Sequence, residues 1–224
     1  MRVKLFLMFF VGFSLIAQSV AARNDVAIPE YTVEGLKLIP NTKDVALVWA
    51  DPDADLAQYK RITLLEPYVA FKKNWRRDQN RSNPMKVKTS DMDRIKGRVQ
   101  VAFKEVFTEE LEQGGYMLTT ERAADVLIVR PAVIDLDVTA PDVSSSGRSQ
   151  TYVQAAGSMT LYLELYDAET NDLLAKVLDK RSDRQSGYMQ WQTGPANLAA
   201  GKRMMKPWAE ALRSGLDEAR TATK

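Results

Sequence analysis

Residues 159–179 read MTLYLELYDAETNDLLAKVLD and carry the clearest strand pattern in the chain. Met and Leu at positions 159, 161, 163 and 165 alternate with Thr, Tyr and Glu, which is typical of a strand with one buried and one wet face. Turn-forming residues at 167–172 follow, and a second apolar run then extends to Asp179. This stretch therefore predicts a long antiparallel hairpin at the centre of the fold.

The residues before this hairpin predict more strands. Residues 125–138 begin with a continuous apolar run, and after Pro131 the period becomes two. Residues 116–120 predict a short strand and residues 45–49 an edge strand. Residues 61–71 predict the first main strand, in which Pro67 marks a bulge or an edge position because proline cannot donate to a ladder.

Two helical patterns accompany these strands. Apolar residues at three- and four-residue steps run to Leu111, Ser90 is placed to cap the first turn, and Gly114-Gly115 ends the run. A second stripe lies at 205–219, where Pro195 can begin a helix and Pro207 begins another or kinks the first. The predicted fold class is α+β: a two-layer sandwich with an antiparallel or mixed sheet and two main helices on one face.

Residues 1–22 have the pattern of a secretory signal peptide. A basic start precedes an apolar run of about 13 residues, too short to span a bilayer comfortably, and small residues at 19–22 suit cleavage near Ala22. The alternative is an uncleaved anchor. We expect a periplasmic protein, with secretion as the alternative, and no transmembrane segment after cleavage. The domain prediction is then signal peptide 1–22, extended leader 23–43 and a single α+β domain 44–224.

Composition narrows the function further. Cleavage removes Arg2 and Lys4 from the 31 basic residues and leaves 29 against 29 acidic ones, so a nucleic-acid partner is not expected. The chain has no His and no Cys, which excludes a Ser-His-Asp triad, a Cys nucleophile and an ordinary zinc site. We therefore expect no enzyme activity, no cofactor and no metal.

The strongest candidate site is a cationic segment at residues 72–88, predicted to be a loop. It has seven basic residues, one aromatic side chain and a single acid, Asp78. Such a patch suits an anionic glycan, a lipid head group or an acidic partner protein, although a solvated loop is the commoner explanation. A second polar loop at 181–194 carries another isolated Trp. The candidate binding residues are Lys72, Lys73, Trp75, Arg76, Arg77, Arg81 and Trp191.

Two acidic patterns are weaker. Residues 51–55 alternate Asp in the manner of a calcium loop, but Leu56 and Ile62 stand where Gly and Glu are required, so Asp-Pro turn chemistry explains them. Asp135 and Asp137 are predicted on one strand face, where Glu164 from a neighbouring strand could join them. The wet face of a strand normally carries such residues, so a carboxylate-based hydrolase is the least favoured hypothesis.

Several blocks resemble a family of exported bacterial proteins of unknown function, the domain-of-unknown-function 3313 type, most of them predicted lipoproteins. The blocks are residues 51–56 with Tyr59, the strand with Glu66-Pro67, the helix ending at Leu111, residues 124–133, residues 164–175, and a final helix with Trp208. The resemblance spans about residues 49–220. It implies an envelope location and an α+β domain, and it assigns no functional residue. This chain lacks the lipobox cysteine of such lipoproteins.

Two hypotheses of function follow. The leading one is a non-enzymatic envelope protein of the periplasm that binds or assembles with another envelope component, either a protein or an anionic molecule, with a homo-oligomer as a further possibility. The alternative is a periplasmic small-ligand or glycan binding module, in which Trp75 or Trp191 stacks on a sugar while Lys72, Arg76 or Arg77 holds an anionic group.

Overall fold

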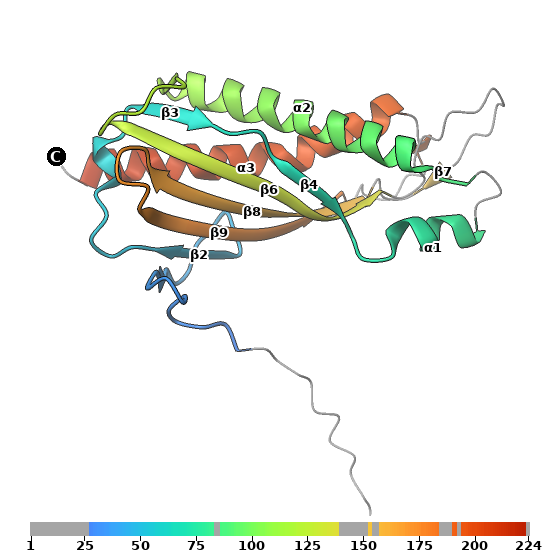
Figure 1. Cartoon of the computed structure of the whole chain (residues 1–224), viewed down its shortest axis with the longest axis horizontal. Helices are drawn as coiled ribbons and strands as arrows, with labels where there is room; N and C mark the ends of the chain where they lie inside the picture. The colour runs from blue at the N-terminus through green and yellow to red at the C-terminus, as the bar shows by residue number, and fades with distance from the viewer. Residues whose placement is uncertain are drawn as a thin grey trace, which may run out of the picture.

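The computed structural model describes residues 27–82, 86–138, 152–153, 157–183, 190–191 and 194–222 (Figure 1). The predicted signal peptide at 1–22 lies outside these residues. Among the residues described, eight strands form one mixed sheet in the order β1-β2-β9-β8-β6-β3-β5, and β4 also pairs with β6. The strands are β1 (Lys37–Leu38), β2 (Leu47–Ala50), β3 (Arg61–Leu64), β4 (Tyr68–Phe71), β5 (Met117–Leu118), β6 (Val126–Val138), β8 (Gly157–Asp167) and β9 (Leu173–Ser182).

The predicted hairpin is confirmed as β8 and β9, which pair antiparallel from Ser158↔Ser182 to Tyr166↔Leu173. Its turn is stabilised by the side chain of Asp167, whose Oδ1 accepts from the N–H groups of Glu169 and Thr170, both at 2.7 Å. The other long strand, β6, lies antiparallel to β8. These three strands form the centre of the sheet.

The predicted strand at 61–71 is interrupted. It forms β3 and β4, which lie end to end along β6 and pair with it in parallel. Because β3 ends opposite Val129 and β4 begins opposite Ala132, Pro67 and Pro131 both fall at the interruption, where neither has to donate to a ladder. The sheet is therefore mixed, with its parallel part confined to the β3, β4 and β5 side.

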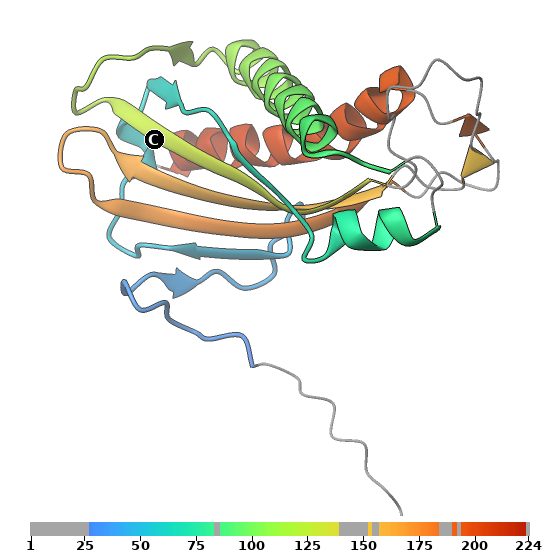
Figure 2. The same cartoon turned by 45° about the vertical axis from the view of Figure 1, so that its right-hand side comes forward.

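Two helices cover one face of this sheet. Figures 1 and 2 show α2 (Thr89–Gln113) and α3 (Gly194–Ala222) on the same side of the strands. Phe103 and Phe107 of α2 stack at 3.9 Å between ring centroids, and with Met205 and Trp208 of α3 they belong to one buried cluster with the inner residues of β6 and β8. The predicted two-layer α+β fold is confirmed.

Helix boundaries differ from the predictions in three places. α2 begins at Thr89, and the Asp91 carboxylate, not Ser90, caps it by accepting from the Lys88 N–H at 2.9 Å. α3 is one helix that contains Pro207. The predicted loop at 72–88 contains α1 (Trp75–Ser82), an eight-residue helix with a single apolar side chain, too few to show a helical period.

Part of the predicted leader joins the sheet. β1 pairs with β2, Tyr31 forms an isolated bridge with Lys37, and Leu36 is buried. Elsewhere, β7 (Tyr152–Val153) and β10 (Gln190–Trp191) form a separate two-stranded pair, and a 3-10 helix, η1 (Leu56–Gln58), precedes β3. None of the helices within the described ranges combines the length and hydropathy needed to cross a membrane.

Candidate functional site

The face of the sheet opposite α2 and α3, here called the open face, presents a row of side chains across five strands. The register places Arg130 of β6 beside Glu164 of β8, Glu164 beside Lys176 of β9, and Lys176 beside Trp49 of β2. A neighbouring row runs from Tyr68 of β4 through Ala132 of β6 to Tyr162 of β8. Aromatic and charged residues therefore gather on a face that neither α2 nor α3 covers.

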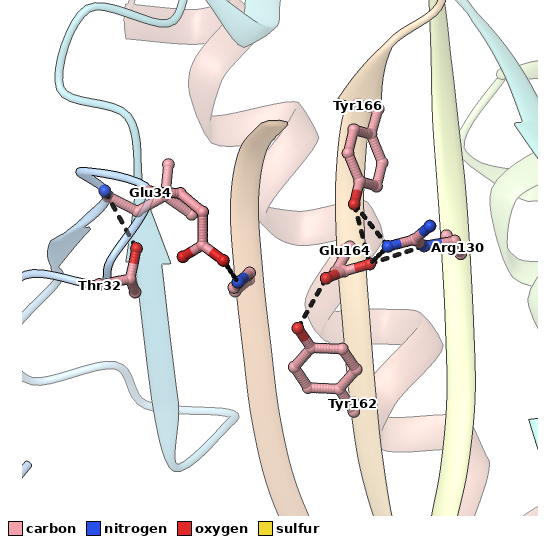
Figure 3. Close-up of polar contacts among 8 residues, drawn as sticks. Thr32, Glu34, Arg130, Tyr162, Glu164 and Tyr166 are labelled. Atoms are coloured by element: carbon pink, nitrogen blue, oxygen red, sulfur yellow. Dashed lines mark hydrogen bonds and ion pairs between the residues drawn. The ribbon is translucent and has the colours of Figure 1, made fainter. Parts of the chain in front are cut away.

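Glu164 is the centre of this arrangement (Figure 3). Its Oε1 accepts from the Tyr162 hydroxyl at 2.6 Å, and its Oε2 accepts from the Tyr166 hydroxyl at 3.0 Å and from Arg130 Nε at 2.6 Å. Arg130 also forms an ion pair with Glu164 through Nη2, and its guanidinium lies 4.9 Å from the centre of the Tyr166 ring. Although Glu164 sits on an open face, it is only 6% exposed.

These contacts determine the charge of Glu164. Burial alone would raise the pKa of the carboxyl group, but the hydrogen bonds from Tyr162, Arg130 and Tyr166 together outweigh it and hold the pKa below its ordinary value of 4.5. The pKa values of both tyrosine hydroxyls are raised, first by burial and then by the bonds to Glu164. At neutral pH the cluster therefore holds one carboxylate, two neutral phenols and one guanidinium, and Glu164 is not poised to donate a proton.

The N-terminal segment borders the same face. Lys176 Nζ donates to Glu34 Oε1 at 2.6 Å, and this bond is the main reason that the pKa of Glu34 is lowered to about 2. Trp49 Nε1 donates to the Pro29 carbonyl at 3.0 Å. The segment around residues 29–34 is thus tied to the β2 and β9 side of the open face, whereas Tyr68 on the β4 side is 67% exposed.

The predicted cationic site lies elsewhere, on α1 and the residues before it. Lys72, Lys73, Arg76, Arg77 and Arg81 are exposed there. Trp75 is not the exposed platform that the sequence predicted: it is 3% exposed, stacks on Phe71 at 4.2 Å and donates from Nε1 to the Val138 carbonyl at 3.2 Å. Trp75 attaches α1 to the end of β4 and β6, because its ring fills the core edge.

Some of these cations have nearby partners. Lys72 Nζ lies 3.2 Å from Asp137, Arg77 Nε lies 3.2 Å from Asp78, and Arg76 donates to the Thr89 hydroxyl at 2.9 Å. The backbone of Trp191 lies in β10, away from α1 in the chain and in a separate sheet, and its side chain lies outside the described residues. The binding role of the cations and of Trp191 stays a prediction.

The acidic candidates do not assemble. The pairing of β6 with β8 shifts between Ile134 and Asp137, and Asp135 at this bulge has a φ of 50°, so the two Asp residues do not lie on a regular strand. Glu164 pairs with Arg130 instead of joining them. Asp51 and Asp55 accept backbone N–H groups at 3.0 and 2.9 Å, which confirms their turn role. No group of three metal-ligating side chains is found in the portion of the chain that is described.

The Glu164 cluster was not predicted as a site. The period of two at 159–166 does place Tyr162, Glu164 and Tyr166 on one strand face, which is half of the information needed. The other half is the register of β6 against β8, which brings Arg130 opposite Glu164. Arg130 is the one charged residue in the otherwise apolar stretch 126–134, and this interruption is the signal that could have pointed to it.

A family model described as protein of unknown function (DUF3313) matches residues 35–212. This match covers most of the chain and includes every strand and helix of the large sheet layer described above. The chain belongs to the DUF3313 family. The resemblance carried by the sequence blocks is thereby confirmed, and the matched range begins within the segment predicted as a leader.

Comparison with solved structures finds two similar chains of other families. Protein XCC0632 from Xanthomonas campestris, of family-model DUF330, matches at 12% identity and a TM-score of 0.43, covering 78% of this chain and 93% of that chain. The PelC dodecamer from Paraburkholderia phytofirmans matches at 8% identity and a TM-score of 0.38, covering 74% and 96%. No curated protein matches this DUF3313 chain.

Proposed function

We propose that this DUF3313 protein is an exported, non-enzymatic protein of the bacterial envelope, acting in the periplasm by binding another envelope protein through its open face. The observation that carries the proposal is the Glu164 cluster. It holds charged and aromatic groups in a fixed arrangement on a face that α2 and α3 leave uncovered. Tyr, Trp and Arg are the residues that protein interfaces favour.

The shape and chemistry of the face support a macromolecular partner. Small ligands are usually enclosed in concave pockets, whereas this face is the surface of a sheet. Glu164 is held as a carboxylate by three donors, so it suits recognition of a fixed charge pattern better than general acid catalysis. The signal-peptide pattern at residues 1–22 and the lack of His and Cys support the exported location and the non-enzymatic role.

Site-specific photocrosslinking in living cells tests the proposal. The photoreactive residue p-benzoylphenylalanine replaces Tyr68, which is 67% exposed and lies on the open face because its strand neighbour Val69 points into the core. The matched control replaces Val101, which is 61% exposed on α2. We expect a crosslinked envelope protein from position 68 and none from position 101, in periplasmic or membrane fractions.

Two results would contradict the proposal. Recovery of the native protein in the cytoplasm would remove the exported location. A crosslinking pattern that is empty at position 68, or the same at both positions, would remove the open face as the contact surface.

A further inference from the structure

An apolar groove lies on the other side of the sheet, between α3 and the strands β2, β8 and β9. Its cavity has a volume of about 160 Å³. The floor is formed by inner-face side chains that include Val48, Leu163 and Val177, and the wall by Trp208, Ala211 and Gly215 of α3. All of the residues that line it are apolar.

The one polar atom on the wall is already bonded. The Trp208 indole Nε1 donates to Asp179 Oδ2 at 2.6 Å, so the ring presents no unpaired donor to the groove. A ligand that needs hydrogen bonds would lose its bonds to water here and gain none. The lining therefore selects for hydrocarbon.

The groove exists because α3 has small residues where it crosses these strands. Ala211 and Gly215 are one helical turn apart and lie on the same helix face. A Cβ placed on Gly215 would meet nothing within 4 Å, so the space beside it is open. Protein interiors are usually packed without voids of this size.

We propose that this groove binds a single fatty acyl chain, with the head group left in water at its mouth. The volume decides between occupants: an apolar cavity of about 150 Å³ binds a molecule the size of benzene, whereas a helix with side chains is about 10 Å across. A few methylene groups fit and a peptide helix does not. The proposal is independent of the open face, because the two sites lie on opposite faces of the sheet.

Binding is measured by fluorescence titration with cis-parinaric acid, a fatty acid that brightens in apolar surroundings, and with decanol as a competitor that lacks the carboxylate. The test variant is Gly215→Leu, which places a side chain into the open space of the groove. The control is Gly97→Leu on α2, since a Cβ at Gly97 also meets nothing within 4 Å. Both substitutions remove a helical glycine, so both variants should fold.

We expect wild-type protein and Gly97→Leu to bind the probe with the same affinity, decanol to displace it, and Gly215→Leu to bind at least tenfold more weakly. Failure of the wild type to bind, or equal binding by both variants, would overturn the proposal. So would a change of sedimentation coefficient in Gly215→Leu with unchanged probe binding, because the groove would then be a contact between two copies of the chain.

Discussion

The two faces of the central strands bury their side chains by different means. On the inner face, Leu161 and Leu163 of β8 are covered by α2 and α3 and touch only apolar neighbours of the core cluster. On the open face, Glu164 of the same strand is buried by Tyr162, Tyr166 and Arg130, which are also its hydrogen-bond partners. The inner face is stabilised by exclusion of water, and the open face by a few directed polar contacts.

This difference predicts how each face responds to mutation. Apolar burial does not depend on pH, whereas a carboxylate with a lowered pKa contributes stability only where it is ionised. A flat polar surface also tolerates the loss of one contact better than a packed core tolerates a cavity. Three substitutions test this contrast, in decreasing order of expected effect.

Phe103→Ala on the inner face should have the largest effect. Phe103 is fully buried and stacks on Phe107, so truncation removes apolar contacts and leaves a cavity. We expect the free energy of unfolding to fall by about 3 to 5 kcal/mol, equally at pH 7 and pH 4. Urea denaturation measures this change, with Val101→Ala on the solvent side of the same helix as the control. A loss below about 1 kcal/mol would show that the core is not the main source of stability.

Glu164→Gln on the open face should have an intermediate effect that depends on pH. At pH 7 the substitution weakens charge-assisted bonds, and we expect a loss of about 1 to 2 kcal/mol. The folded pKa of Glu164 lies below its ordinary value of 4.5. The stability that the carboxylate contributes is therefore present above that pH and lost as the pH falls through the folded pKa.

The difference between wild type and Glu164→Gln should thus shrink in urea unfolding curves recorded from pH 7 down to pH 3.5. A difference that stays constant over this range would mean that Glu164 is not held as a carboxylate by its neighbours.

Lys72→Ala should have the smallest effect. Its Nζ lies 3.2 Å from Asp137, but the two side chains are 60% and 31% exposed, so water and salt screen the pair. We expect a change within about 0.5 kcal/mol, similar to that of Lys73→Ala as the control. A loss above 1 kcal/mol in thermal or urea unfolding would place this pair with the Glu164 cluster and not with ordinary surface charges.

Local patterns were sufficient for the long elements and insufficient for the short ones. The β8 and β9 hairpin and helix α2 follow from periods of two and 3.6, because each has enough residues to show a period. Helix α1 was predicted as a loop, since its only apolar residue, Trp75, shows no repeat. Trp75 was predicted as a ligand platform because sequence reveals an aromatic side chain but not the core edge that it fills.

The sequence by itself determined the α+β class, the family, the central hairpin and the apolar face of α2, because these depend on neighbours close in the chain. Tertiary structure alone decided that Arg130 meets Glu164 across 34 positions, and that Ala211 and Gly215 cross the sheet where they leave a groove. Both depend on strand register and on where a helix lies on a sheet. Those are set by packing between distant segments, which no local period encodes.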